Sequence, residues 1–457
     1  MMSRTADATG TPTINAESEA TLLAEVFPHD SQRNARGVLV LGGAPVDHLI
    51  EEHGTPLYVF DEATLRAQCR AYAQPLAREY PNSLALYASK AHLDPTIAGI
   101  VAEEGLGADA VSSGETRVAL AGGMPADRIV FHGNNKLPAE IDYALDVGIG
   151  RIVVDSLDEL DLIAEIAAHR SGPPAPVILR ITPGVEAHTH EYIRTGAIDS
   201  KFGLQLHSGA AEEAVARAQA SDSIDLTGLH AHIGSQVLDV EPYADSLGIV
   251  LDFAADMSDR HDLVLRDISP GGGFGVSYSE ADDPPAAGSF VEVIAATLRD
   301  RRLDPEPRLL IEPGRSIVAR AGVALYRVGT IKRIPGVRTY VSVDGGMADN
   351  IRPALYGAQY RALIADRPPD GSRQLVTVAG RYCESGDVLL RDIELPTLRR
   401  GDVLAIPAAG AYHMSMASNY NLVGRPATVL VRDGQARVTR PRETDADLLA
   451  AFAPVET

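Results

Sequence analysis

Short apolar segments that end in polar or glycine-rich turns recur between residues 84 and 312, and amphipathic stretches separate them. Apolar runs of this length, bounded by turns, are typical of buried strands. One intervening stretch places Leu160, Ile163, Ala164 and Ala167 at the i, i+3, i+4, i+7 spacing that predicts a helix. The predicted strands lie at 84–89, 107–113, 128–133, 151–156, 177–184, 225–234, 265–273 and 308–314.

Eight strand–helix repeats predict a (β/α)8 barrel. An open doubly wound sheet is the alternative, but no GxGxxG motif opens the first helix. The residues with reactive side chains follow the ends of the predicted strands, and barrel active sites form on that face.

After Gly314 the pattern changes to a series of strand-like segments with turns between them, which predicts a β-rich second domain. The segment 56–61 also has a strand-like pattern and leads into the first barrel helix. We expect residues 1–57 to form a tail and a segment that packs on the β domain, 58–320 to form the barrel, and 321–457 to form the C-terminal domain.

Composition narrows the class of protein. The chain has 457 residues and is 45% hydrophobic, so it can form two sizeable cores. Asp and Glu outnumber Lys and Arg by 62 to 41, which argues against nucleic-acid binding because that needs a basic surface. Two cysteines cannot build a disulfide framework and indicate a cytoplasmic protein. The chain contains no apolar run of 18 residues, so no membrane span is predicted. Residues 1–20 are predicted to form a polar tail.

Lys90 ends the first predicted strand, and two interpretations are open. Most lysines lie on the surface, but a partly desolvated lysine on a rigid element can form a Schiff base. The run Gly271–Gly273 follows the seventh strand. It is either a tight turn or a loop whose backbone N–H groups bind phosphate, as the last loops of barrels often do.

Glu312 closes the eighth strand, within the sequence EPGR. It either forms a salt bridge with Arg315 or lies beside a pyridine nitrogen, where an acid keeps a cofactor ring protonated. His232 is either a core histidine or a flat ring stacked on a cofactor.

Two groups of histidines raise the possibility of a metal. His230 lies on the same strand face as His232, but no carboxylate or cysteine joins them at metal-ligand spacing. His188, His190 and Glu191 lack the helical HExxH spacing, so we expect a substrate-facing loop or plain surface there. We predict no metal.

The second domain contributes further polar candidates. Cys383 in CESGD is either an inert packing residue or a thiol that can donate a proton to a carbanion. Arg352 and Tyr356 can bind a carboxylate, and Glu384 can bind a substrate ammonium. Together they describe a pocket for a substrate that is charged at both ends.

Several longer strings resemble the diaminopimelate decarboxylase family, within the fold-type III pyridoxal phosphate decarboxylases. The resemblance runs from about Leu22 to Leu449. It rests on YASKA, HGNNK, GVEAHTHEYI, SKFGL, HIGSQ, GGGFG, EPGR, SVDGGMADNIRPALYGAQY, CESGD, AGAY and SNYNLVGRP. The lysine, GGG and EPGR segments are shared with ornithine and arginine decarboxylases of that fold.

The resemblance implies an alanine-racemase-like barrel with a C-terminal β-sandwich domain, and a pyridoxal 5'-phosphate cofactor. It implies that Lys90 attaches the cofactor, that His232 stacks on its ring and that Glu312 pairs with its ring nitrogen. Cys383 is the implied proton donor and acts in the site of the neighbouring subunit of a homodimer. The implied phosphate-region residues are Ser235, Gly273, Pro313, Gly314, Arg315 and Tyr412, and the implied substrate-binding residues are Arg315, Arg352, Tyr356, Glu384 and Tyr412.

The implied reaction is the decarboxylation of meso-2,6-diaminopimelate to L-lysine and CO2, the last step of lysine biosynthesis. The main alternative is a related decarboxylase that acts on another amino acid in a specialised pathway. An amino acid racemase is disfavoured by an acid at Glu312, and a non-enzymatic cofactor carrier would lack the second domain and Cys383.

Overall fold

The computed structural model describes residues 16–184, 201–279 and 282–453. Its described residues fall into two compact units, which are 65–184 with 201–276 and 283–319, and 16–64 with 277–279, 282 and 320–453. The division lies within the first turn of helix α3 (Glu62–Glu79). Strand β4 (Leu57–Asp61) therefore belongs to the second unit, whereas the predicted boundary fell at residue 58.

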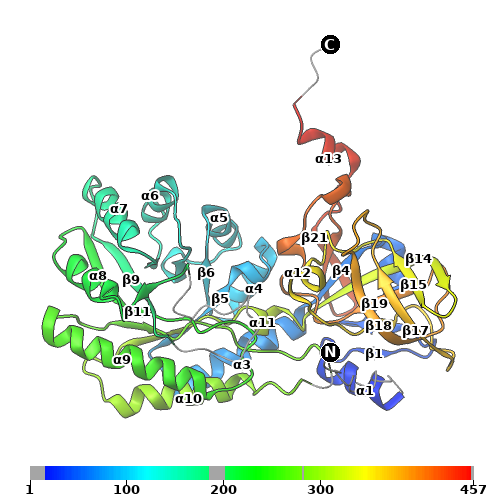
Figure 1. The fold of residues 1–457 in the computed structure, drawn as a ribbon, viewed down its shortest axis with the longest axis horizontal. Coiled ribbons are helices and arrows are strands. Elements are labelled where there is room, and N and C mark those ends of the chain that lie inside the picture. Colours follow the sequence, from blue (N-terminus) through cyan, green and yellow to red (C-terminus); the bar gives the residue numbers. More distant parts are fainter. Residues whose placement is uncertain (1–15, 185–200, 280–281, 454–457) are drawn as a thin grey trace, which may run out of the picture. The chain divides into compact units, whose positions relative to one another are not determined.

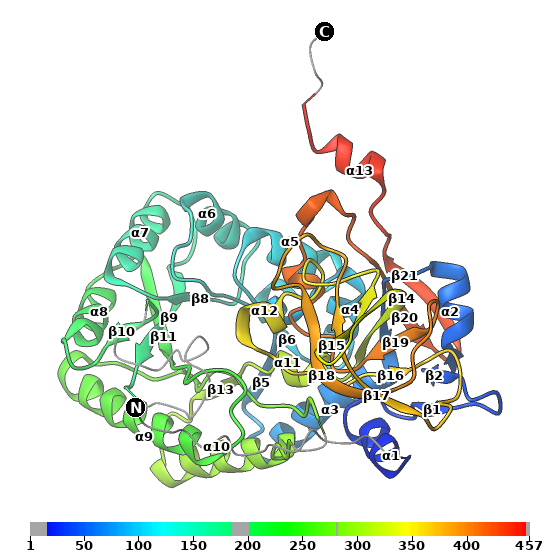
Figure 2. The same cartoon turned by 45° about the vertical axis from the view of Figure 1, so that its right-hand side comes forward.

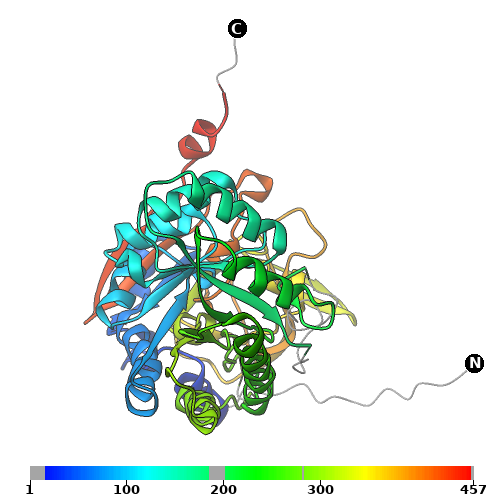
Figure 3. The same cartoon turned by 90° about the vertical axis from the view of Figure 1, so that its left-hand side faces the viewer.

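The first unit is a closed barrel of eight parallel strands, as predicted (Figures 1 and 3). Neighbours in the ring follow chain order, and β13 pairs with β5 to close it. All eight predicted strands are confirmed. They are β5 (Ser83–Ala88), β6 (Gly107–Ala110), β7 (Ile129–Phe131), β8 (Arg151–Val154), β9 (Ala175–Thr182), β11 (Ile224–His230), β12 (Asp267–Ser269) and β13 (Arg308–Ile311).

Helices surround these strands (Figure 3). Buried apolar side chains from several strands fill the barrel interior, among them Leu86, Val130 and Ile178. Besides α3, the helices are α4 (Pro95–Glu103), α5 (Ser113–Ala121), α6 (Pro138–Asp146), α7 (Leu157–Ala168), α8 (Ala210–Gln219), α9 (Glu241–His261), α10 (Ala287–Arg301) and the short α11 (Arg315–Val318). A two-residue strand, β10 (Leu204–Gln205), extends β9.

Polar residues in the turns after strands also start the next helices. Ser156 follows β8, and its side chain accepts a hydrogen bond from the backbone N–H of Glu159, which caps α7. Leu160 and Ile163, from the predicted apolar stripe, are buried on that helix. Local sequence therefore sets both the start and the buried face of the helix.

The second unit is a mixed sheet organised around the long strand β14 (Gly322–Ile334), as labelled in Figure 2. The first half of β14 pairs with β4 and β19, and its second half pairs with β15. The other strands are β15 (Arg338–Val343), β16 (Leu363–Ile364), β17 (Arg373–Ala379), β18 (Val388–Pro396), β19 (Val403–Ile406), β20 (Ala427–Arg432) and β21 (Gln435–Arg440).

The N-terminal segment shares the core of this unit. Leu22 and Phe27 belong to the same buried cluster as Val59 of β4 and Val323 of β14. Its elements are α1 (Ala16–Glu25), β1 (Gln32–Arg33), β2 (Leu39–Leu41), β3 (Ala44–Pro45) and α2 (Val46–His53), and the unit also contains α12 (Arg352–Tyr356) and α13 (Asp445–Ala450). Among the described helices, none has both the length and the apolar character of a membrane span.

Candidate active site

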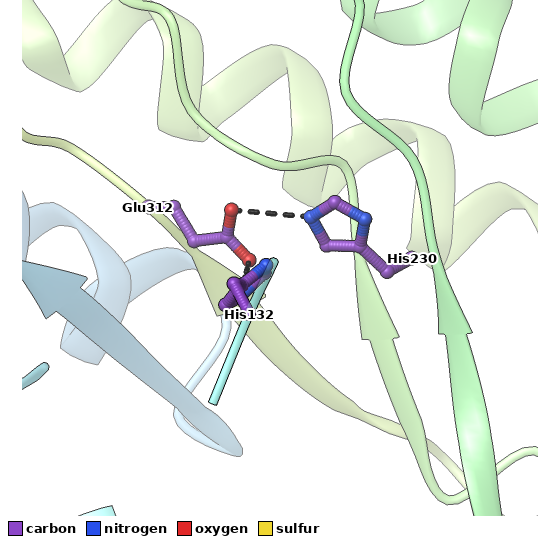
Figure 4. Close-up of side chains that lie close together, drawn as sticks. All are labelled: His132, His230 and Glu312. Atoms are coloured by element: carbon purple, nitrogen blue, oxygen red, sulfur yellow. Dashed lines mark hydrogen bonds and ion pairs between the residues drawn. The ribbon is translucent and has the colours of Figure 1, made fainter. Parts of the chain in front are cut away.

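Glu312 lies just after β13, and its buried carboxylate gathers polar groups from three other strands. Its Oε2 lies 3.1 Å from Nε2 of His230, at the end of β11. Its Oε1 accepts a hydrogen bond from Ser269 at 3.0 Å and lies 3.4 Å from Nε2 of His132, which follows β7. Figure 4 shows both imidazole rings pointing at the carboxylate. Strands far apart in sequence thus meet at one acid.

This environment keeps Glu312 ionised. Burial opposes its charge, but His230 and His132 outweigh burial and hold the pKa of Glu312 well below its usual value. Burial lowers the pKa of His230, the adjacent Glu312 carboxylate opposes that shift, and His230 donates to Glu312 from Nε2. A carboxylate offers about four acceptor sites, and three protein groups approach Glu312. One acceptor site therefore remains for an N–H group of a ligand.

Lys90 and His232 follow two other strands of the barrel. Lys90 lies in the single turn Ser89–Ala91 directly after β5, and it is exposed. His232 lies two residues after the end of β11, and its Nδ1 accepts the backbone N–H of Gly272 at 3.3 Å. Burial, followed by the positive charges of Lys90 and Arg180, holds the pKa of His232 well below its usual value. His232 is thus a neutral ring that carries its proton on Nε2.

The Gly271–Gly273 loop packs too closely against its neighbours to carry side chains. A Cβ on Gly272 would lie 1.8 Å from the carbonyl oxygen of Glu312, and one on Gly273 would lie 2.0 Å from that of Gly234. Gly273 also has a φ of +94°, in the region that favours glycine. The loop is therefore bare backbone, which can approach a ligand closely.

The turn after β13 is fixed in the same region of the barrel. The carbonyl of Pro313 accepts the backbone N–H of Ala88, at the end of β5. Gly314 leads into α11, whose first residue, Arg315, is buried and donates from Nη2 to Ser235 Oγ at 3.0 Å. The structure thus brings these phosphate-region candidates to the strand ends where Lys90 and Glu312 also lie.

A second lysine at this end of the barrel has a different environment. The ammonium of Lys136 donates to the carbonyls of Gly133 and Val153 at 2.6 Å each and to both carboxylate oxygens of Glu159 at 3.1 Å. Burial lowers its pKa. All of its protons have acceptors, so Lys136 is a structural cation, whereas Lys90 is exposed to solvent.

The remaining candidates lie in the second unit. Arg352 starts α12 and is buried, and Tyr356 ends that helix half-buried. Tyr412 is half-buried and has a φ of +61°, which is rare for a residue with a side chain. Cys383 and Glu384 are both exposed, and the backbone N–H of Cys383 donates to Asn421 at 3.0 Å. Burial raises the pKa of Asp387 in the same CESGD loop, where it accepts the backbone N–H groups of Met347 and Tyr382.

The contacts of His132 and His230 with Glu312 were not predicted from the sequence. No carboxylate joins His230 and His232 at metal-ligand spacing along the chain, but the fold brings one to His230. Glu312, 82 residues further along the chain, lies against His230, and with His132 these three side chains have the geometry of a possible metal-ligand group. Spacing along the chain cannot reveal such a group because the barrel assembles it from separate strands. His188, His190 and Glu191 lie outside the described residues.

Comparison with known proteins identifies the class. The model of the pyridoxal-dependent decarboxylase family, pyridoxal binding domain, matches residues 62–319, which span the barrel and the turn of Glu312. The barrel with its strand-end residues is therefore that of a pyridoxal-dependent decarboxylase. A lysine/ornithine decarboxylase from Vibrio vulnificus, 24% identical with a TM-score of 0.73, shares this fold.

More similar proteins specify the family. The diaminopimelate decarboxylase of Bacillus subtilis is 44% identical over 436 residues, covering 94% of this chain and 99% of that protein. That of Mycobacterium tuberculosis is 41% identical over 94% of this chain and 98% of its own length. A crystal structure of diaminopimelate decarboxylase from M. jannaschii in co-complex with L-lysine aligns with a TM-score of 0.87 and 36% identity, covering 94% of this chain and 99% of that one. The chain belongs to the diaminopimelate decarboxylase family.

Proposed function

We propose that this protein is a pyridoxal 5'-phosphate-dependent enzyme that decarboxylates meso-2,6-diaminopimelate to L-lysine and CO2. The observation that carries the proposal is the anchored, ionised Glu312 carboxylate, in a barrel whose strand ends also hold Lys90 and His232. Family membership over nearly the whole chain supports the substrate. L-lysine, the expected product, is bound in two related solved structures.

The barrel residues fit the cofactor. Glu312 has one acceptor site left for the ring N–H, the glycine loop offers bare backbone to a phosphate, and Lys90 has an accessible amine for covalent attachment. When bound, the cofactor withdraws electrons from the substrate α-carbon, which is the electron sink that loss of CO2 requires. We interpret the His132–His230–Glu312 group as the anchor of Glu312 and propose no metal there.

Each remaining residue has a proposed task. Neutral His232 packs on the cofactor ring and adds no positive charge beside it. Ser235, Gly273, Pro313, Gly314, Arg315 and Tyr412 bind the phosphate region, and Arg315, Arg352, Tyr356, Glu384 and Tyr412 bind the substrate. An arginine fork can bind a carboxylate with two parallel hydrogen bonds, which suits a substrate with a carboxylate at each end.

The test of the function is lysine production by the purified, cofactor-loaded protein. We expect lysine from meso-diaminopimelate and none from the LL-isomer, and no CO2 release from L-lysine, L-ornithine or L-arginine. CO2 release from a different amino acid instead would keep the reaction type and overturn the substrate. Cofactor binding without any turnover would contradict the enzyme proposal.

We propose that the Sγ–H of Cys383 returns a proton to the substrate α-carbon and that it does so in the site of the second subunit of a homodimer. Exposure of Cys383 is consistent with this role. Cys383→Ala should lower kcat by about 10²-fold, the usual contribution of a positioned general acid, with cofactor content unchanged. Unchanged turnover would remove the proton-donor role.

A subunit-mixing experiment tests whether the sites are shared. Cys383→Ala and Lys90→Ala homodimers are each expected to be nearly inactive, but a mixed dimer contains one site with both native residues. Activity that appears on mixing supports a site built from two subunits, and its absence in a verified mixed dimer contradicts it. Both cysteines are free, which supports the proposal of a reducing, cytoplasmic location.

A further inference from the structure

Arg352 is a buried cation whose described partners carry no charge. The residue is 6% exposed, and its Nη1 donates to the hydroxyls of Tyr278, at 2.8 Å, and Tyr360. The guanidinium also lies over both rings, 5.0 Å and 5.7 Å from their centroids. Among the described residues, no carboxylate lies within ion-pair distance of it. Burying a charge is costly unless an opposite charge compensates it, and among the described residues the candidate for that charge lies further away.

A continuous line of buried side chains leads from Arg352 to such a charge. The Tyr360 hydroxyl lies 2.9 Å from Nε2 of His413, and Nδ1 of His413 lies 3.2 Å from the Tyr58 hydroxyl. The Tyr58 hydroxyl lies 3.1 Å from Oδ2 of Asp349. These side chains are at most 4% exposed. They come from β4, the turn before α12, the loop after α12 and the segment before Met414, all within the second unit.

The direction of each hydrogen bond follows from Asp349. Burial raises the pKa of Asp349 to about 6, while hydrogen bonds from Tyr326, the backbone of Gly346 and Tyr58 limit the rise, so the group is a carboxylate at neutral pH. A carboxylate and a carbonyl only accept, so Tyr326 donates to Oδ2 of Asp349, and Tyr58 donates to Asp349 at Oδ2 and at its backbone carbonyl, 3.0 Å away. A tyrosine hydroxyl has a single proton, so His413 must donate to Tyr58 from Nδ1. With its ring proton placed on Nδ1, His413 accepts the Tyr360 hydroxyl proton at Nε2, and the Tyr360 oxygen accepts from Arg352.

We propose that Asp349 is the remote counter-ion of Arg352, linked to it by the one-directional chain Arg352→Tyr360→His413→Tyr58→Asp349. The inference rests on the proposed function, in which Arg352 binds a substrate carboxylate. A carboxylate in direct contact with Arg352 would compete with the substrate. The chain compensates the buried charge from a distance and uses only the Nη1 protons. The Nε–Nη2 edge, for which the described residues provide no partner, stays available for a bidentate carboxylate. Asp349, Tyr58, His413 and Tyr360 are therefore positioning residues.

The structure offers a matched pair of variants. Tyr58 and Tyr326 are both fully buried tyrosines, and both contact Oδ2 of Asp349 through their hydroxyls. Tyr58→Phe breaks the chain to Arg352. Tyr326→Phe removes one donor from Asp349 and the 2.9 Å contact with the Tyr58 hydroxyl, but every link of the chain itself stays in place. Each replacement removes one tyrosine hydroxyl from the same buried cluster. A purely structural role of the cluster would therefore affect both variants alike.

We expect Tyr58→Phe to raise the KM for meso-diaminopimelate about tenfold, the scale of one hydrogen bond to a charged group, with kcat within about twofold. Tyr326→Phe should change KM less than about threefold. Asp349→Asn removes the charge and keeps the shape, so it should raise KM by about as much as Tyr58→Phe. It replaces Tyr58→Phe as the test if that variant does not fold. Equal changes in KM for the two phenylalanine variants, or a lower kcat with KM unchanged, would overturn the inference.

Failure of the proposed function is distinguishable from failure of this inference. If the wild-type protein does not turn over meso-diaminopimelate, the proposed function is wrong, and crystal structures of the two phenylalanine variants decide the positioning role. The inference then expects the Arg352 guanidinium to leave the Tyr360 hydroxyl in Tyr58→Phe and to keep that contact in Tyr326→Phe. An unmoved guanidinium in Tyr58→Phe would contradict it.

Discussion

Replacing Lys90 with alanine is expected to abolish the visible absorption of the lysine-bound cofactor and to lower turnover by on the order of 10⁴-fold or more, since it removes the proposed covalent attachment. The chain contains only four lysines, Lys90, Lys136, Lys201 and Lys332. Lys136 cannot take over, because its ammonium is surrounded by two carbonyls and a carboxylate. Lys90 lies at a strand end and is accessible.

The measurement combines absorption spectra with borohydride reduction of the holoenzyme, followed by peptide mapping. Label on the Lys90 peptide alone is the expected result. Lys136→Met is the control. It leaves Glu159 buried without its partner and should lower the free energy of unfolding by about 3–5 kcal/mol, yet molecules that remain folded should keep the absorption. An absorption band that survives in Lys90→Ala would place the cofactor on another residue.

The sequence predicted the barrel well because its local signals agree with its tertiary structure. Each of the eight apolar segments became a parallel strand, and turn residues such as Ser156 cap the helices that follow. The boundary between the units was harder to predict. β4 has the pattern of any buried strand and precedes a barrel helix, but it pairs with β14 and β20 of the second unit. Strand pairing at a separation of more than 250 residues leaves no local trace in the sequence.

The site was only partly predictable for the same reason. Lys90 and Glu312 could be singled out because each ends a strand, and their proposed roles remain predictions. The groups that hold Glu312 are Ser269 and His230, which donate hydrogen bonds, and His132, which lies 3.4 Å away, and only the closed barrel brings these residues of three other strands together. The chain from Arg352 to Asp349 is equally invisible in the sequence, although Asp349 and Arg352 are only three residues apart. Its intermediates, Tyr58, Tyr360 and His413, are distributed over most of the second unit.

Replacing Glu312 with glutamine is expected to lower kcat by about 10³-fold while the protein still binds its cofactor through Lys90. The carboxylate is held ionised by His230 and His132 against the cost of burial, so it can keep a ring nitrogen protonated. A neutral amide of the same shape cannot, and the cofactor then withdraws electrons less strongly from the substrate α-carbon. Because the amide can still hydrogen-bond to Ser269 and His230, the fold around position 312 should persist.

Asp267→Asn provides the matched control. Asp267 is also a buried barrel carboxylate, on β12, but it pairs with Arg151 at 2.7 Å, at the start of the strands rather than at their ends. Both changes turn a buried carboxylate into an amide, so both should lower stability, but only Glu312→Gln should lower kcat. Steady-state kinetics, cofactor content and thermal melts of the two variants separate these effects. A kcat that falls equally in both would mean that Glu312 acts through the stability of the barrel, and an unchanged kcat in Glu312→Gln would remove its proposed role beside the ring nitrogen.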